Sequence, residues 1–148
     1  MASRTDQLRA AALGRTIIFV HGANAPTADE WETVLRLFRE AENLSEVRAL
    51  VYSEGAAPTL AQRGDLNDLL GDRNPRIAVL TPSKFVRAAG MALRWFNPRV
   101  RVFNPAQLKD ALSHLEVQAG EAASLASTLG RLIGELGLRS PLASAARP

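Results

Sequence analysis

The stretch RIAVLTPSKFVRAAGMALRWFNPRVRVFNPAQLKDALSHL, residues 76–115, decides the fold of this chain. It contains two short apolar runs, at residues 77–80 and 100–103, and each run is followed by a polar turn and a helical pattern. Strands that alternate with amphipathic helices are typical of a parallel sheet with helices packed against it. The stretch therefore predicts a β-α-β-α unit. It holds no catalytic signature.

The same alternation extends toward the N-terminus. Residues 16–20 form a continuous apolar, β-branched run, as expected for a strand buried on both faces, and residues 47–52 give the next strand. Each predicted helix begins at a residue whose side chain can cap free backbone N–H groups, namely Thr27, Thr59, Thr81 and Asn104. The sequence thus predicts an α/β fold with a small, open, four-stranded, mainly parallel sheet, alternating helices and right-handed crossovers.

Helical spacing of apolar residues predicts which side of each helix is buried. The residues expected to face the core are Trp31, Val34, Leu35 and Phe38; Leu60, Leu66, Leu69 and Leu70; Phe85, Val86, Ala89, Ala92, Leu93 and Phe96; and Leu108, Ala111, Leu112 and Leu115.

The two ends of the chain differ from this α/β domain, which is expected to span residues 16–117. Residues 1–15 are an N-terminal extension without the apolar segment of a secretory signal, in which a short helix or a frayed tail is expected. Residues 118–137 predict an amphipathic helix, and residues 138–148 a flexible tail. The helix carries a narrow apolar seam that needs a surface to lie on, either on its own domain or on another chain in a homo-oligomer, through Leu125, Leu129, Leu132 and Leu136.

Composition excludes several classes of protein. The chain has 148 residues, of which 47% are hydrophobic and 22% are charged, so it fits one globular domain. No apolar run approaches the roughly 20 residues that span a bilayer. The sequence has no cysteine and only His21 and His114 as histidines, which excludes disulfides, thiolate ligands and a histidine-rich metal site. We expect a cytoplasmic protein with no metal ion and no cofactor.

Charge is distributed unevenly along the chain. Acidic residues dominate residues 29–72, whereas residues 73–109 contain no acid. The bases of that second segment are Arg73, Arg76, Lys84, Arg87, Arg94, Arg99, Arg101 and Lys109. Such an asymmetry suits a protein partner with an acidic surface, although it also fits a sheet whose ends are solvated by different charges.

A hydrolase-like site is one candidate for chemistry. The segment around His21-Gly22 resembles the oxyanion-hole loop of α/β-hydrolases, and Ser53 follows a strand where a nucleophile would lie. However, Val51 takes the place of the first glycine of the nucleophile motif, and His114 lies inside an amphipathic helix. A hydrolase-like enzyme is therefore the third hypothesis, and we expect the protein not to be an enzyme.

Phosphate and nucleic-acid sites have weaker support. Neither glycine-rich nucleotide-binding pattern is present, and the helix starts at Thr59 and Thr81 are explained by capping. The basic segment with Trp95 and Phe96 carries no known DNA- or RNA-binding motif, so nucleic acid is not an expected partner.

The opening stretch resembles the C-terminal half of a STAS domain, the fold of anti-sigma factor antagonists. The resemblance rests on the strand 77–80, the polar turn 81–83, the second strand ending in Val102-Phe103, and the Ala111-Leu112 pair. Residues 16–115 follow the order of elements of the broader bacterial STAS/SEC14-like group. In STAS antagonists a serine or threonine at the start of a helix is phosphorylated. The Asp-Ser-Ser-Gly type motif of that site is not kept here, where Ser53 and Thr59 are the available hydroxyls.

The resemblance implies a non-enzymatic regulatory domain that acts through protein–protein contacts, and this is the leading hypothesis. The residues expected at its interaction or regulatory surface are Ser53, Glu54, Thr59, Gln62, Arg63, Ser83, Lys84, Arg87 and Arg94. The alternative is a domain that binds a small anionic or lipid-like ligand at the carboxyl ends of the strands, where open α/β sheets bind ligands.

Overall fold

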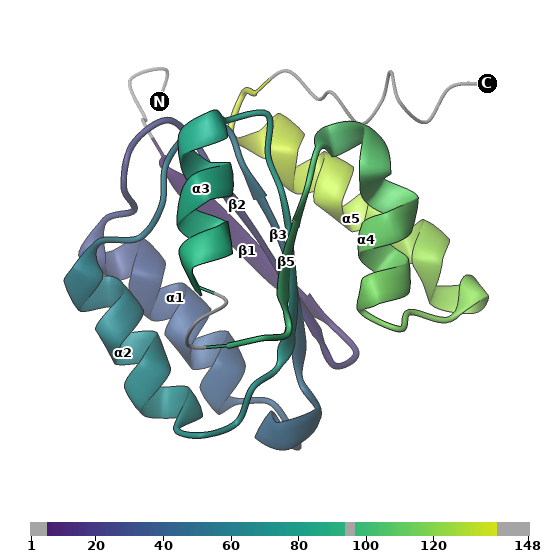
Figure 1. The fold of residues 1–148 in the computed structure, drawn as a ribbon, viewed down its shortest axis with the longest axis horizontal. Helices are drawn as coiled ribbons and strands as arrows, with labels where there is room; N and C mark the ends of the chain where they lie inside the picture. Colours follow the sequence, from purple (N-terminus) through teal and green to yellow (C-terminus); the bar gives the residue numbers. More distant parts are fainter. Residues whose placement is uncertain (1–5, 94–96, 139–148) are drawn as a thin grey trace.

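A five-stranded sheet forms the middle layer of the structure, and helices cover both of its faces (Figure 1). The computed structural model describes residues 6–93 and 97–138. The strands are β1 (Leu8–Leu13), β2 (Thr16–His21), β3 (Arg48–Ser53), β4 (Arg76–Leu80) and β5 (Val100–Phe103). They lie in the sheet in this order, with β2 to β5 parallel and β1 antiparallel to β2. The predicted α/β fold is confirmed.

The sheet has one strand more than the sequence predicted. Residues 8–13, expected in a short helix or a frayed tail, form β1, which pairs with β2 from Leu8 opposite His21 to Leu13 opposite Thr16. The turn between them is tight, and Gly14 adopts a left-handed conformation (φ +60°) that suits glycine. The alanine-rich sequence of β1 has little strand preference of its own. Its conformation therefore depends on the free edge of β2.

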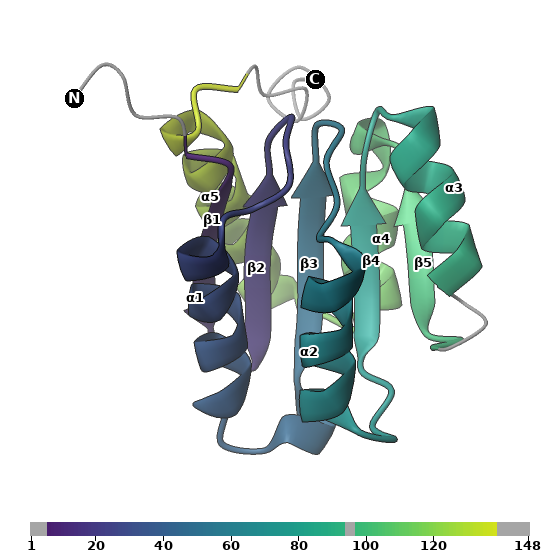
Figure 2. The ribbon, with the colours of Figure 1, turned by 90° about the vertical axis from the view of Figure 1, so that its left-hand side faces the viewer.

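Three helices lie on one face of the sheet: α1 (Ala28–Arg39), α2 (Leu60–Leu70) and α3 (Lys84–Leu93) (Figure 2). Each connects two parallel strands that are neighbours in the sheet. Right-handed crossovers between successive neighbours place every connecting helix on the same side. Capping boxes begin α1 at Thr27 and α2 at Thr59, as predicted. A short 3-10 helix, η1 (Leu44–Glu46), leads into β3.

Burial on these helices follows the predicted pattern with two exceptions. Trp31, Val34, Leu35, Phe38, Leu70 and Val86 are buried. Leu60 and Phe85, however, are 79% and 88% exposed. The side chains of Ala92, Leu93 and Phe96 lie outside the described part of the structure.

Gly90 explains the exposure of Phe85. A Cβ atom at Gly90 would collide with Cγ2 of Val102, so the backbone of α3 lies directly on β5 at this point. Because Val86 and Gly90 are one helical turn apart, they define the side of α3 that faces the sheet. Phe85 is rotated away from that side into solvent.

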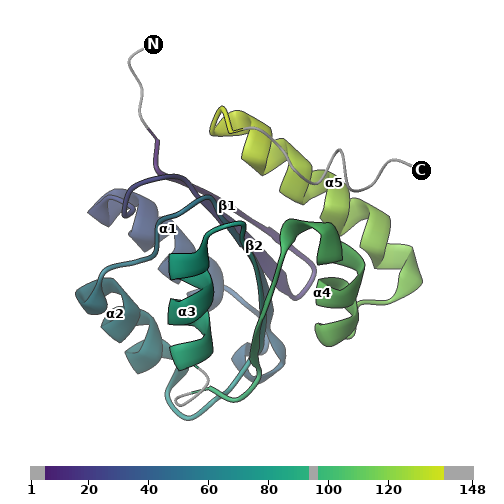
Figure 3. The same ribbon diagram turned by 45° about the horizontal axis from the view of Figure 1, so that its top comes forward.

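The other face of the sheet carries α4 (Leu108–His114), preceded by the 3-10 helix η2 (Pro105–Gln107), and α5 (Ala119–Glu135). In Figure 3, α5 lies along the sheet beside β1 and β2. Leu125, Leu129 and Leu132 are buried in one cluster with strand residues, and Leu136 is partly buried against it. The apolar seam of this helix thus packs on its own sheet. In residues 6–93 and 97–138, no helix has the length and apolar character needed to cross a bilayer.

A buried arginine connects β3 to the turn between α4 and α5. Arg48 is 4% exposed, and its guanidinium donates hydrogen bonds to the Thr16 hydroxyl, to two backbone carbonyls and to the Glu121 carboxylate. The two carbonyls belong to Leu115 and Glu116, which form the start of that turn. All three guanidinium nitrogens of Arg48 therefore have hydrogen-bond acceptors, as burial of this charged group requires.

Candidate functional site

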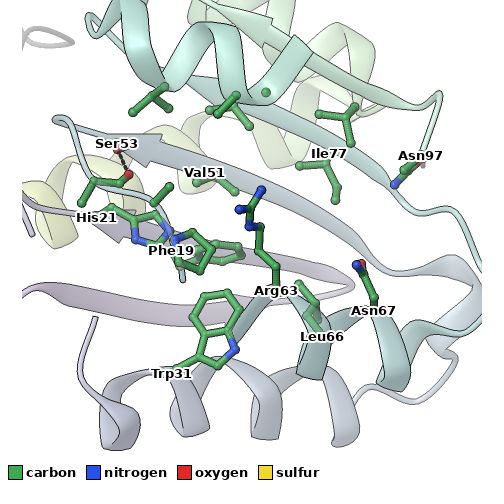
Figure 4. Close-up of a pocket in the computed structure, with 18 of the residues that line it drawn as sticks. Phe19, His21, Trp31, Val51, Ser53, Arg63, Leu66, Asn67, Ile77 and Asn97 are labelled. Atoms are coloured by element: carbon green, nitrogen blue, oxygen red, sulfur yellow. Dashed lines mark hydrogen bonds between the residues drawn. The ribbon is translucent and has the colours of Figure 1, made fainter. Parts of the chain in front are cut away.

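An apolar pocket of about 150 Å³ lies between α2 and α3, on the face of the sheet that α1, α2 and α3 cover (Figure 4). Its floor consists of strand side chains that point to this face: Phe19, His21, Val51, Ser53, Ile77, Val79 and Val100. Its walls come from three helices and two loops, through Trp31, Ala56, Ala57, Pro58, Arg63, Leu66, Asn67, Leu70, Val86, Ala89, Gly90 and Asn97.

The pocket exists because α2 and α3 are held apart. Helix α2 is drawn toward α1, since Trp31 Nε1 donates to the Gln62 carbonyl and the Gln62 side chain donates to the Pro26 carbonyl, each at 2.9 Å. Helix α3 is held at β5 by the close approach of Gly90 to Val102. The residues that face the gap between them include Ala56, Ala57 and Ala89, whose side chains are too small to fill it.

His21 is a buried polar group in this apolar pocket. It is 2% exposed, and its Nδ1 atom has no hydrogen-bond partner. Burial lowers the pKa of His21 to about 4, against the opposing effect of the Glu30 charge, so the imidazole is neutral at pH 7. The ring stacks on Trp31, with centroids 6.4 Å apart, and meets Phe19 edge-on at 5.6 Å.

Arg63 brings a positive charge into the pocket. Its side chain extends from α2 toward the floor (Figure 4), and its Nε atom is buried without a hydrogen-bond partner. The described ion pairs do not include Arg63, and the residues that line the pocket include no aspartate or glutamate. The guanidinium therefore lacks a counter-ion within the described part of the chain.

The Ser53 hydroxyl is engaged in a hydrogen bond to the backbone. Ser53 lies opposite His21 on the neighbouring strand, but it is 1% exposed and donates to the Ala56 carbonyl at 2.5 Å. His114 lies on the other face of the sheet, where its Nε2 is 2.7 Å from the Arg99 carbonyl. The three residues considered for a hydrolase therefore do not form one site.

The loop and helix that follow Ser53 contain four of the residues expected at a regulatory surface. Glu54 accepts a hydrogen bond from the Tyr52 hydroxyl at 2.6 Å, and burial together with this bond raises the pKa of Tyr52. Thr59 and Gln62 form the capping box of α2, and Gln62 also holds α2 to α1. Among these four residues, only Arg63 lines the pocket.

The remaining predicted residues are distributed over the molecule. Ser83 accepts a hydrogen bond from the Val86 backbone N–H at the start of α3, whereas Lys84 and Arg87 are exposed on that helix. Arg94 lies outside the described residues. Helix α5, with Leu125, Leu129 and Leu132 and with Leu136 at its C-cap, lies on the opposite face of the sheet from the pocket. The structure therefore brings together Ser53 and Arg63 but not the whole predicted set.

Sequence reasoning did not identify several pocket residues, including Trp31, Asn67, Asn97 and His21 in this role. A signal was available for His21. Residues two apart in a strand point to the same face of the sheet. His21 therefore shares a face with Phe19 on β2, and Ser53 shares that face with Val51 on β3. The contributions of α2 and α3 depend on how the helices are placed, for which the sequence has no local signal.

Comparison with known proteins supports the fold. No family model and no curated protein matches the sequence. A solved structure does match: an uncharacterized protein of the DUF3478 family with a SpoIIAA-like fold, from Shewanella loihica PV-4. It is 19% identical, the TM-score is 0.56, and the match covers 78% of this chain and 98% of that one. This likeness shows the fold alone. The chain therefore has the SpoIIAA-like, STAS-like fold that the sequence resemblance implied.

Proposed function

We propose that this chain is a non-enzymatic STAS-like binding module that takes a small ligand into the pocket between α2 and α3. The observation that carries this proposal is an apolar pocket with two buried, unpartnered polar atoms, His21 Nδ1 and Arg63 Nε. Buried polar atoms in folded proteins nearly always have a hydrogen-bond partner. Concave, mostly apolar sites with a few polar groups are the usual form of ligand pockets.

The position of the pocket refines the ligand-binding hypothesis drawn from the sequence. That hypothesis placed a ligand at the carboxyl ends of the strands. The pocket includes His21 and Ser53 at those ends, but it extends along the sheet to Ile77 and Val100 near the amino ends. Because α1, α2 and α3 all lie on one face, the parallel strands have no switch point between them that would open a crevice at the edge.

The test is to fill the pocket. Ala89 faces it, whereas the neighbouring Ala88 is exposed and does not line it. In a Trp95→Phe background Trp31 remains as the sole tryptophan, and its emission reports on a ligand in the pocket. Small aromatic and aliphatic molecules that change this emission should lose affinity in Ala89→Phe and keep it in Ala88→Phe. Equal binding to both variants would exclude the pocket.

A regulatory role through protein contacts is the second candidate, and two exposed side chains favour it. Leu60 and Phe85, 79% and 88% exposed, lie in the first turns of α2 and α3. Lys84 and Arg87 flank Phe85 with exposed positive charges, which suits a partner whose surface is acidic around an apolar centre.

This second candidate has its own test. A partner isolated with the intact chain should be lost with the double variant Phe85→Ser, Arg87→Glu, and its binding should weaken at high salt. The matched variant Arg36→Glu changes an exposed charge on α1 and should keep the partner. Retention by both variants would remove this surface from consideration.

A further inference from the structure

We infer that the ligand of this pocket is a small monoanion with an apolar body, an aromatic or short aliphatic carboxylate, and that Arg63 is its counter-ion. This inference rests on the proposed function, because it names the class of ligand that the same pocket takes. It is carried by the contrast between two arginines on opposite faces of the sheet, Arg48 of β3 and Arg63 of α2.

The two guanidinium groups differ in their partners. Arg48 donates to four acceptors, and one of them is the Glu121 carboxylate at 2.9 Å. Arg63 lines the pocket, and its Nε atom is buried with no acceptor. Arg63 is partly buried as a whole, and a buried donor such as its Nε–H destabilises the fold when it has no acceptor, most of all in a charged group. Arg63 is therefore the group of the pocket that gains most from an anion.

The acids nearest in sequence do not meet this need. Asp65 and Asp68, on the same helix, face α1 instead, where they line a shallow depression with Glu32 and Arg39. The pocket side of α2 carries Arg63, Leu66, Asn67 and Leu70. The helix thus separates its acidic side from the side on which Arg63 lies. An anion from solution is therefore the proposed partner of Arg63.

The single positive charge of Arg63 favours a ligand with a single negative charge. Among the described residues that line the pocket, Arg63 is the only lysine or arginine, so a phosphate group, with a charge of about −1.5 to −2 at pH 7, would be only partly neutralised by them. A carboxylate carries a single charge, and its two oxygens match the forked donors of a guanidinium. The charge count therefore points to a carboxylate.

The size and lining of the pocket define the body of the ligand. Its volume of about 150 Å³ equals that of an engineered cavity that holds benzene. Phe19, Trp31, Val51 and Val79 offer aromatic and branched surfaces to it. An aromatic ring or a short aliphatic chain fits this volume, whereas a long lipid chain would have to leave it.

The experiment titrates the full chain with four probes by calorimetry: phenylacetate, its neutral counterpart phenylacetamide, phenyl phosphate, and laurate. We expect phenylacetate to bind about 10- to 100-fold more tightly than phenylacetamide, the range for a hydrogen bond to a charged group. Arg63→Met keeps much of the stem and removes the charge, so it should bring phenylacetate to the affinity of phenylacetamide. Arg63→Lys should bind phenylacetate with intermediate affinity, and Arg36→Met, on the exposed side of α1, should behave as the wild type.

The outcomes separate this inference from the proposed function. Equal affinity for phenylacetate and phenylacetamide, or a preference that survives in both Arg63 variants, would overturn the role of Arg63 while the pocket still binds ligands. Tighter binding of phenyl phosphate or laurate than of phenylacetate would overturn the carboxylate class or the size class. Absence of binding by all four probes would overturn the inference, and if no ligand changed Trp31 emission either, the proposed function would fall with it.

Discussion

Nη2 of Arg48 lies 2.9 Å from Oε1 of Glu121 and so joins the middle of the sheet to the first turn of α5. The same arginine donates to the carbonyls of Leu115 and Glu116, where the chain turns between α4 and α5 with Glu116 at φ +60°. The hydrogen bond from Arg48 holds the pKa of the Glu121 carboxyl below its usual value. One side chain thus fixes the position of the helix pair that covers this face of the sheet.

Substitution of Arg48 should destabilise the protein strongly. Arg48→Met leaves the Thr16 hydroxyl and the two turn carbonyls without their donor, and we expect a loss of about 2–4 kcal/mol in the free energy of unfolding. Urea denaturation followed by circular dichroism measures it. Arg39→Met is the control, because the Arg39–Glu32 pair is exposed and should contribute about 0.5 kcal/mol or less. Equal losses in the two variants would contradict the role of Arg48.

Acidification should destabilise the protein through His21. The pKa of this residue is lowered to about 4 by burial, from an unfolded value near 6.5, so the unfolded chain binds the extra proton first. The contribution of His21 is therefore fully present above pH 6.5 and is lost as the pH falls toward 4, by about 3 kcal/mol in total.

His21→Phe should remove this part of the pH dependence, as measured by urea denaturation between pH 4 and pH 7. Burial also lowers the pKa of His114, with the hydrogen bond to the Arg99 carbonyl opposing, so the comparison is made in a His114→Gln background. An unchanged slope in His21→Phe would show that His21 is protonated as easily in the folded protein as in the unfolded chain.

The close approach of α3 to β5 predicts opposite effects of alanine at two glycines. Gly90→Ala places a methyl group against Val102 and should cost about 1–3 kcal/mol, because the helix must move away from the strand. Gly64→Ala, on α2 with open space around it, should stabilise by up to about 1 kcal/mol through helix propensity. Thermal denaturation tests both. Val102→Ala should partly rescue Gly90→Ala, and failure of that rescue would argue against this contact.

Helix α5 should act within its own chain. Leu129 is fully buried against the sheet, and Leu129→Ala should lower the free energy of unfolding by about 2–5 kcal/mol. Ser127→Ala, on the exposed side of the helix, should have little effect. Sedimentation should give the same mass for Leu129→Ala as for the wild type, whereas a fall in mass without loss of stability would support the homo-oligomer considered from the sequence.

Most elements of the fold could be predicted from local sequence patterns. Apolar runs located β2 to β5, and the capping residues Thr27 and Thr59 located the starts of α1 and α2. The strand β1 was not predictable in this way, because its sequence LRAAAL has little preference for a strand, and its place depends on pairing with β2. The exposure of Phe85 was also hidden, since it follows from the rotation of α3 that Gly90 sets.

The site was less accessible to sequence reasoning than the fold. Ser53 and Arg63 were singled out for a regulatory surface, and both line the pocket. The pocket itself results from two contacts between residues that are far apart in the sequence. The hydrogen bond from Trp31 to Gln62 and the close approach of Gly90 to Val102 hold α2 and α3 apart. Periodicity places residues on the face of a helix but does not give the separation of two helices.

Nuclear magnetic resonance can show whether the pocket between α2 and α3 binds a small carboxylate. In a ¹⁵N-labelled sample titrated with phenylacetate, the Nε–H signal of Arg63 and the backbone signals of Asn67 and Gly90 should shift together and saturate. The backbone signals of Leu125 and Leu129, on the opposite face, should stay in place. Saturating shifts confined to other surfaces, or no saturable shifts at any concentration, would show that this pocket does not bind the carboxylate.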